Sequence, residues 1–584
     1  MEKETSVYEY ILAEESAYKT VKIPITSSVE WNMYDHIERC TNVANGWFHT
    51  GSNDSKTKRP YRDIVTPIKN VALRSEGFDV KDIVPYVNDI NENHKSFLVK
   101  KYHPQWARKN ELDTFIDELV ESSVVYDLAL IKNVNNTRPE VVKLQQIAFC
   151  DQTDIMSGPI CLKHQYTPAQ LVEFKGKWND DKIDEAIVMS KAEKSSPNKG
   201  QKAKTPGKYI EVYELVGNLP EYWLGEGGDM FKYTPQRHFV CYYTSQDGNK
   251  NGVTLYSGKD KSLSDSFKAL VLNPIFGRAC GMSIIESLFD PQVWANYSEI
   301  KIKQMLDSIV TLFQTDSDEL GDQKLTDLKL NTILKHESGK PITQVSSQLQ
   351  NLPALTNYQI SHENNARTIG SASDAQLGTN PVSGTPFALQ NLVVQQGQGI
   401  HEYRQGKIAT FVADVLYRDW ILKYLVDEMS KGLKFSEELS LDELTEIADK
   451  ISRNKSEDRI KEMVLKGETV TNEDREALIS TFKEQFMQTG QRGFFEVVEG
   501  ELKEIPVDVF VNIKGKQKYM AQNADKITNI MREVMANPQA FAQIPGLGKV
   551  FNQLLEESGM NAIDFSKITT PVEQPKQPVG ELQV

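Results

Sequence analysis

The stretch PALTNYQISHENNARTIGSASDAQLGTNPVSGTP, residues 353–386, decides how this chain of 584 residues is organised. Its first half predicts a polar helix over 353–370 with only a thin apolar stripe, made of Leu355, Tyr358, His362 and Ile369. Its second half, 371–386, consists almost entirely of small and turn-forming residues. A connection of this length is usually functional or mobile, and the alternative interpretation is an ordinary surface loop.

A long helix is predicted after this connection, over residues 387–429. Apolar residues recur along one side of it, at Leu389, Leu392, Val393, Ile400, Phe411, Val412, Val415, Leu416, Ile421 and Leu425. At ~1.5 Å per residue, an unbroken helix of this length would span roughly 60 Å. Three glycines, Gly397, Gly399 and Gly406, favour a kink or a break.

Another helix is predicted before the opening stretch, after the turn-rich segment FGRACG at 276–281. One face of this helix carries Ile302, Met305, Leu306, Ile309, Val310 and Phe313. Glu299 and Lys303 are spaced as an i,i+4 pair on another face. Between the two helices, the sequence predicts a hairpin with arms at 332–335 and 341–345.

The first 270 residues indicate an α+β region. Residues 111–125 have the spacing of an amphipathic helix, and a short helix is expected at 168–176. Strands are expected at 126–131 and 141–149, and period-two alternation at 209–215 and 238–243 indicates partly exposed antiparallel strands. The basic segment 191–208 is expected to be a mobile loop. Both Trp31 and Trp47 are expected to pack in a local core.

The C-terminal part is charged, and residues 431–510 are predicted to be helical. A strand is expected at 507–513, followed by helical pieces over 517–557. The tail from residue 570 contains Pro571, Pro575 and Pro578 and is expected to be disordered.

The composition bounds the function. Hydrophobic residues make up 39% and charged residues 25%, so a folded protein of several domains is expected. The net charge of −14 argues against a surface that grips DNA phosphates, but it allows an acidic wall past which DNA slides. No apolar run approaches the ~20 residues of a membrane helix, and the acidic N-terminus lacks the features of a signal peptide, so synthesis in a cytoplasm is expected.

Catalytic and metal-binding motifs are not found. The five cysteines include no C-x-x-C pair and none lies near a histidine at ligand spacing, so reduced structural thiols are expected. Around Lys549 the sequence has Gln543 and Val550 where a phosphate loop needs Gly and Ser or Thr. The alternative from another class is a metal-dependent nucleic-acid enzyme that uses carboxylates such as Asp151 and Asp154.

The order of these elements resembles that of the portal proteins of tailed bacteriophages, which runs wing, stem, clip, stem, tunnel loop, wing and crown. Three stretches also resemble podovirus-type portals, including those of crAss-like phages. They are FGRACGMSIIESLFD at 276–290, YIEVYE at 209–214 followed by Leu219-Pro220, and the strand 507–513 followed by KGKQ at 514–517.

The resemblance implies an α+β, mostly helical portal fold. By position it implies a wing at 1–275, a wing-to-stem helix at 276–312, a clip at 313–352, a second stem helix at 353–370, a tunnel loop at 371–386, a long wing helix at 387–430, a helical C-terminal region or crown at 431–569 and a disordered tail at 570–584.

The resemblance also implies site residues. The tunnel-loop candidates for the DNA channel are Ser373, Asp374, Gln376, Thr379, Asn380 and Ser383, which offer neutral hydrogen bonds and one negative charge. Lys301 and Lys303 are stem candidates for phosphate contacts; otherwise they are solvent-exposed or paired with Glu299 and Asp307. The clip candidates for tail or adaptor docking are Asp316, Asp318, Lys335 and Lys340.

The partners implied are those of a head vertex. Twelve copies would close into a ring through heterologous contacts, and double-stranded DNA would pass through it during packaging, retention and ejection. The ring would contact the major capsid and scaffold proteins, a separate terminase motor, and then adaptor or tail proteins. It would be made in the host cytoplasm and would need no cofactor. A different head–tail connector or minor capsid protein is the alternative within the virion.

Overall fold

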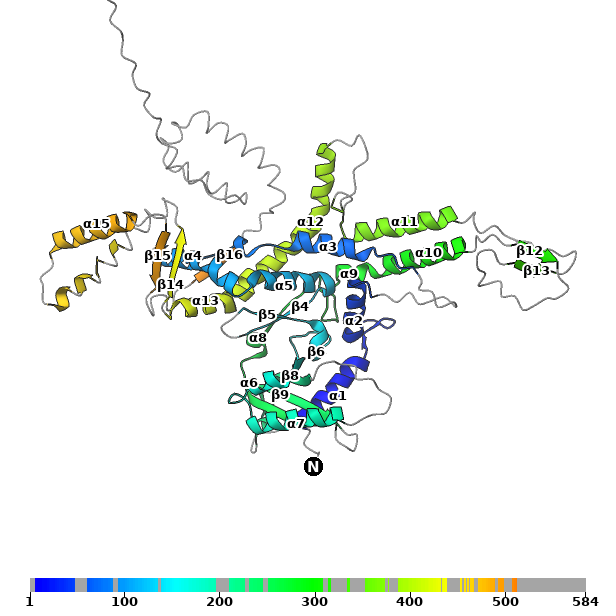
Figure 1. Ribbon diagram of the computed structural model, residues 1–584, viewed down its shortest axis with the longest axis horizontal. Coiled ribbons are helices and arrows are strands. Elements are labelled where there is room, and N and C mark those ends of the chain that lie inside the picture. Colours follow the sequence, from blue (N-terminus) through cyan, green and yellow to red (C-terminus); the bar gives the residue numbers. More distant parts are fainter. Residues whose placement is uncertain are drawn as a thin grey trace, which may run out of the picture. The chain divides into compact units, whose positions relative to one another are not determined.

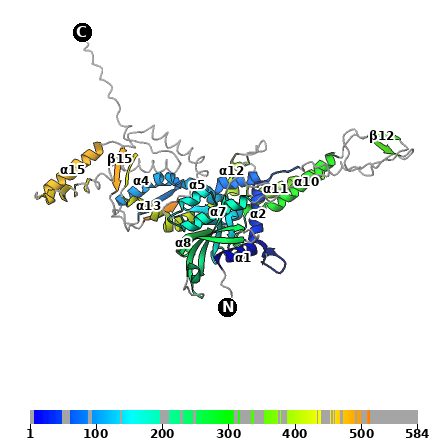
Figure 2. The same cartoon turned by 60° about the horizontal axis from the view of Figure 1, so that its bottom comes forward.

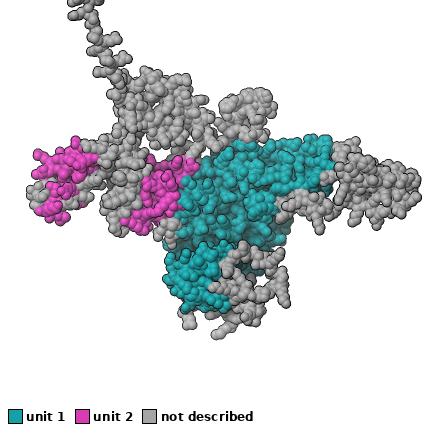
Figure 3. Space-filling view, in the orientation of Figure 1, with its two compact units in different colours: residues 1–78, 111–415 teal, residues 79–110, 416–584 magenta. Residues whose placement is uncertain are grey.

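The computed structural model describes most of the first 431 residues and shorter stretches beyond them. The described residues are 6–47, 60–87, 93–134, 138–195, 209–225, 231–244, 250–307, 313–316, 333–336, 352–372, 376–377, 387–431, 433–438, 452–453, 456–457, 459–461, 463–466, 471–488, 492–497 and 507–511. They form two compact units, each built from two separate segments (Figure 3). Unit 1 is Met1–Phe78 with Glu111–Val415, and unit 2 is Asp79–Asn110 with Leu416–Val584.

Unit 1 mixes helices and strands, as Figure 1 shows. Its helices are α1 (Val7–Thr20), α2 (Met33–Ala44), α3 (Val65–Glu76), α5 (Leu112–Tyr126), α6 (Pro168–Glu173), α7 (Asp180–Ser195), α8 (Leu263–Ser266), α9 (Ile284–Ser287), α10 (Phe289–Asp307), α11 (Leu352–Ile369) and α12 (Phe387–Phe411). Its strands are β1 (Ile23–Pro24), β2 (Glu30–Trp31), β4 (Ala129–Lys132), β5 (Glu140–Val142), β6 (Ile147–Phe149), β7 (Ile160–Tyr166), β8 (Ile210–Pro220), β9 (Tyr233–Thr244), β10 (Lys250–Lys259), β11 (Phe267–Leu270), β12 (Phe313–Asp316) and β13 (Ile333–His336).

The largest sheet is antiparallel, with strand order β10-β9-β8-β7-β6. Neighbouring residues of β8 face opposite layers: Val212 joins a cluster with Leu171 of α6, whereas Tyr213 joins the main core. Because helices cover both faces, β8 is buried almost throughout. The strands predicted at 209–215 and 238–243 are thus confirmed, but the expectation that they are partly exposed is wrong for β8.

Helix α5 confirms the helix predicted at 111–125 and is deeply buried along one face. Leu112, Phe115, Ile116 and Leu119 are each at most 1% exposed. Full burial of such a side chain contributes roughly 1.5–3 kcal/mol. The helix ends at Tyr126, and the next residue, Asp127, has a left-handed φ of 52°. The chain then enters the three-stranded sheet β11-β4-β5.

The two predicted tryptophans differ. Trp31 lies in the main core of unit 1 and is 8% exposed, so local packing is confirmed there. Trp47 is 62% exposed, and the same expectation was wrong for it. All five cysteines are free and buried, as expected for structural thiols.

The helix predicted at 387–429 is present without interruption, but its middle part is π-helical and not α-helical. Helix α12 runs through all three glycines without a break, and Figure 1 shows it changing direction along its length. A π-helical segment, Val412–Ile421, and then α13 (Leu422–Met429) continue it. Wider π-helical turns are rare and often occur at functional sites.

Unit 2 brings together segments that are remote in the sequence. It contains α4 (Asn93–Lys109), α13, α15 (Asn472–Gln488), β3 (Ile83–Val87), β14 (Leu433–Glu438), β15 (Arg492–Val497) and β16 (Val507–Val511). Strand β16 pairs antiparallel with β3, and β14 pairs antiparallel with β15. His103 of α4 contacts the hydroxyl of Tyr417 at 2.9 Å.

Several boundaries need correction. The region 431–510 is not purely helical, because β14 and β15 lie in it. The strand at 333–336 pairs in parallel with β12, so it is not simply one arm of a hairpin; the other predicted arm, 341–345, lies outside the described residues. The helix predicted after FGRACG, α10, ends at Asp307, so Phe313, which was expected on its apolar face, belongs to β12 instead. The loop predicted at 191–208 is wrong for 191–195, which belong to α7. The rest of that loop, the pieces predicted at 517–557 and the tail from 570 lie outside the described residues.

Candidate assembly surface on the paired helices

Helices α10 and α11 form a pair that extends from the rest of unit 1. Figure 1 shows the two helices side by side, with β12 and β13 beyond their ends, and Figure 2 shows the same part of the chain from another side. Of α11, only Gln359 and Ala366 are buried. Helix α11 is therefore mostly exposed, whereas the first half of α10 is largely buried.

The seam between the helices is polar. Gln359 Nε2 donates to Glu299 Oε2 at 2.6 Å. Arg62 joins both helices, because its guanidinium pairs with Glu363 of α11 and lies 3.9 Å from Glu299 of α10. The predicted stripe is only partly correct, since Tyr358 and Ile369 of α11 are 47% and 37% exposed. The buried line of α11 instead passes through Gln359.

The base of α10 is clamped to the chain segment before α3. Gln292 is fully buried; its Nε2 donates to Arg62 O at 2.6 Å, and its Oε1 accepts from Ile64 N at 3.1 Å. Asn296 Oδ1 accepts from Arg62 N at 2.9 Å. These bonds orient the pair through backbone groups that would otherwise be left unsatisfied.

The end of α11 is anchored as well. A Cβ on Gly370 would lie 2.1 Å from Ile68 Cγ2 of α3, so glycine permits this close approach. Ser371 follows with a left-handed φ of 51°. The start of α10 and the end of α11 are thus both attached to α3 or to the segment that precedes it.

The segment FGRACG is a packed entry to α9 and α10. Arg278 binds Glu286 through two nitrogens at 2.9 and 2.7 Å, and it lies 5.7 Å from the ring of Trp31. Gly277 has a φ of 81°, which glycine adopts without strain. Burial raises the pKa of the Cys280 thiol well above its usual range. This cysteine is accordingly a structural, unreactive thiol.

The outer surface of α10 carries exposed aromatic rings. Trp294 and Tyr297 are 47% and 49% exposed, and their rings meet edge to face at 5.9 Å. Lys301 follows one turn later, with its Nζ 5.5 Å from the Tyr297 ring centre. The i, i+3, i+7 spacing places these three side chains in one stripe.

The outer surface of α11 is also partly apolar. Tyr358 packs edge to face against His362 at 4.4 Å, and Ile360 is 48% exposed. Leu306, near the far end of α10, is 50% exposed. Because Tyr358 and Ile360 are two residues apart in a helix, they point to different sides and form no single stripe.

The predicted site residues are only partly within the described residues. Lys301 and Lys303 lie on α10, both partly buried. Gln376 lies in a turn beside Leu377, which packs against the main core. Asp316 is the last residue of β12. Lys335 lies in β13, where it is paired with Thr315 of β12. Ser373, Asp374, Thr379, Asn380, Ser383, Asp318 and Lys340 lie outside the described residues.

Sequence reasoning missed Arg62, Gln292 and the Trp294–Tyr297 stripe. The stripe had a visible signal in the sequence, because Trp294, Tyr297 and Lys301 have the spacing of one helix face. Arg62 and Gln292 had none, since their partners are far away in the chain.

The carboxylates of the enzyme alternative cap a turn. Asp151 Oδ1 accepts from Thr153 N and Asp154 N at 2.7 and 3.1 Å, and Asp154 Oδ1 accepts from Met156 N at 3.0 Å. Burial raises the pKa of Asp151, but these hydrogen bonds outweigh it and lower the pKa overall. Among the described residues, no group of three or more His, Cys, Asp or Glu side chains is placed to hold a metal ion.

Comparisons with protein-family models and with curated proteins find no match to this chain. Within the described ranges, no helix combines the length and apolar character needed to cross a bilayer. Any assignment of function therefore rests on the sequence pattern and on the geometry of the paired helices.

Proposed function

We propose that this chain is one subunit of a portal ring of a tailed bacteriophage. In this role it is a non-catalytic channel at the capsid vertex for packaging, retaining and ejecting double-stranded DNA. The proposal includes the portal fold and a closed symmetric ring, with about twelve subunits by the resemblance to portal proteins. The ring would dock a separate terminase first and adaptor or tail proteins later.

The observation that carries the proposal is the exposed stripe on α10. A lone monomer would leave Trp294 and Tyr297 half in water, on a helix pair that extends from unit 1. In a ring of identical copies, heterologous contacts would bury such a stripe against the next subunit. Aromatic residues are enriched at interface centres because they bury a large area with little loss of side-chain freedom.

Other features support the same function. The insertion β12–β13 lies between the paired helices in the chain, as a clip lies between stem helices. The connection 371–386 leads from α11 to the long α12. A net charge of −14 suits a wall that does not hold DNA phosphates.

The test is assembly of the purified chain, followed by native mass spectrometry and negative-stain microscopy. We expect rings of one subunit number with a stain-filled centre. The double variant W294E/Y297E should remain monomeric with an unchanged thermal unfolding curve. The matched control is F231E, since Phe231 is 87% exposed elsewhere in unit 1.

Two outcomes oppose the proposal. The proposal would be refuted if the chain stayed monomeric under two conditions: at its highest soluble concentration, and when mixed with the coat and scaffold proteins encoded with it. Rings in which deletion of 371–386 leaves DNA packaging and retention unchanged would point to an adaptor instead. Magnesium-dependent DNA cleavage that is lost in D151A would favour the enzyme alternative.

A further inference from the structure

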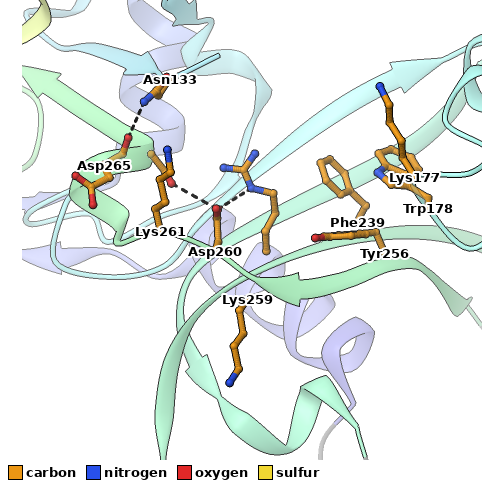
Figure 4. A pocket seen from close by; sticks show the side chains of 11 residues that line it. Asn133, Lys177, Trp178, Phe239, Tyr256, Lys259, Asp260, Lys261 and Asp265 are labelled. Atoms are coloured by element: carbon orange, nitrogen blue, oxygen red, sulfur yellow. Dashed lines mark hydrogen bonds and ion pairs between the residues drawn. The ribbon is translucent and has the colours of Figure 1, made fainter. Parts of the chain in front are cut away.

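A cavity of about 340 Å³ opens beside the five-stranded sheet of unit 1. Its walls come from the connection between α6 and α7, from β9 and β10, and from the turn that leads into α8 (Figure 4). No residue of the paired helices lines it. It is therefore separate from the candidate assembly surface.

One wall of the cavity is aromatic. The Trp178 ring is stacked between Phe174 at 4.2 Å and Phe239 at 4.5 Å, and Tyr256 meets Phe239 edge to face at 6.1 Å. Both faces of the indole are thus covered by protein. This wall offers a fixed apolar edge for a ligand side chain, and it offers no open indole face on which a nucleobase could stack.

The lining carries four cationic side chains and two carboxylates, namely Lys177, Arg237, Lys259, Lys261, Asp260 and Asp265, so cations are in excess. Within the described residues, the side chains of Lys177, Lys259 and Lys261 make no hydrogen bond or ion pair. The arginine is different, since Arg237 Nε pairs with Asp260 Oδ2 at 2.8 Å and its Nη1 lies 3.3 Å from Glu214. In Figure 4, Lys177 lies beside the aromatic wall and Lys261 lies on the Asp260 side. Local positive charge on a chain of net charge −14 attracts an acidic ligand.

The backbone around the cavity does not form a phosphate cradle. The amide of Asp260 donates to Pro235 O at 3.0 Å, and that of Asn133 donates to Ser266 O at 2.9 Å. Asn179, beside Trp178, donates its amide to Leu255 O at 3.0 Å. The first turn of α7 is acidic. The available donors are therefore the flexible ammonium groups of the lysines, which can donate to separate carboxylates.

We propose that this cavity is a docking site for an acidic peptide segment of another protein. Carboxylates of that segment pair with Lys177 and Lys261, and one apolar side chain packs against the Trp178–Phe239–Tyr256 wall. The inference is independent of the proposed portal function, because a chain with another role would present the same surface.

The test uses the full chain and a fluorescent probe peptide, Glu-Glu-Phe-Glu-Glu, measured by anisotropy. The variant K177E/K261E should weaken binding by about tenfold or more, since two attractions become repulsions at exposed positions. The control K143E changes an exposed lysine elsewhere in unit 1 and should leave affinity unchanged. Binding should also weaken as salt is raised.

Competition separates the possible ligands. The peptide Lys-Lys-Phe-Lys-Lys, inorganic phosphate and AMP should each fail to displace the probe. Equal weakening in K143E would show general charge attraction and overturn the site. Displacement by phosphate or AMP at concentrations below that of the unlabelled probe peptide would overturn the peptide assignment, as would unchanged affinity in K177E/K261E.

Discussion

Arg404 Nη1 lies 3.1 Å from Asp127 Oδ1, and both side chains are almost fully buried. Arg404 Nε also pairs with Glu76 Oε1 at 2.8 Å, and His401 Nδ1 lies 3.0 Å from the same oxygen. Burial raises the pKa of Asp127 to about 6, although the Asn273 amide and Arg404 act to lower it. This network attaches α12, the helix after the predicted tunnel loop, to α3 and to the end of α5.

Replacing Arg404 should strongly destabilise unit 1. In Arg404→Leu, the carboxylates of Glu76 and Asp127 lose their cation while they remain buried, so we expect a loss of about 3–5 kcal/mol in the free energy of unfolding. Urea unfolding followed by circular dichroism measures it. Lys143→Leu, at an exposed site, should change stability by less than about 0.5 kcal/mol. A loss in Arg404→Leu no larger than in this control would refute the role of the network.

Glu214 should make the free energy of unfolding decrease as the pH falls. Burial alone would raise the pKa of this carboxyl, but Lys132, His164 and Arg237 outweigh it and lower the pKa to about 2. A folded-state pKa below the unfolded value of 4.5 contributes stability above pH 4.5, which is lost as pH falls toward 2. The contribution is on the order of 3 kcal/mol.

The variant Glu214→Gln tests this dependence. Its unfolding free energy, measured at intervals from pH 5 to pH 2.5, should fall less steeply than that of the native chain. It should also be less stable at pH 7, because Lys132 and Arg237 lose a buried partner. Parallel pH profiles for the two proteins would contradict the assignment.

Removing Arg62 should loosen the paired helices without unfolding the unit. The Arg62 side chain is 48% exposed, so its ion pairs with Glu299 and Glu363 are screened, and Arg62→Ala should cost about 1 kcal/mol or less. Amide hydrogen exchange should quicken in α10 and α11 and stay unchanged in α5. Arg39→Ala, at a comparably exposed arginine, is the control; equal effects of both variants on α11 would exclude the proposed joining role.

Substitutions at two phenylalanines, one buried and one exposed, should show that the cost of losing the ring depends on its burial. Phe115 of α5 is 0% exposed, whereas Phe276 is 94% exposed. Phe115→Ala should lower the unfolding free energy by about 3–5 kcal/mol through the cavity it leaves. Phe276→Ala should change it by less than about 0.5 kcal/mol, unless a partner covers this ring. Similar losses in thermal or urea unfolding would contradict the described packing.

Local periodicity explains which predictions from sequence succeeded. Helices α5 and α11, the strands β8 and β9, and β16 were all foreseen, because side-chain spacing along the chain reflects the helical or extended backbone directly. The apolar stripe of α11 was misplaced because a polar seam, bridged by Gln359 and Arg62, replaced the apolar contact that the pattern implied. Trp47 was expected to be buried, but residue type alone does not provide a neighbour to cover it.

The sequence by itself determined the α+β character, the order of the elements and the absence of recognised catalytic motifs, since these depend on spacing between near neighbours. Only the tertiary structure decided that β3 pairs with β16, that Glu214 meets cations from three other strands, and that Arg62 joins α10 to α11. Such contacts join residues far apart in the chain. They depend on how packed elements exclude water, and no local pattern of residues encodes that.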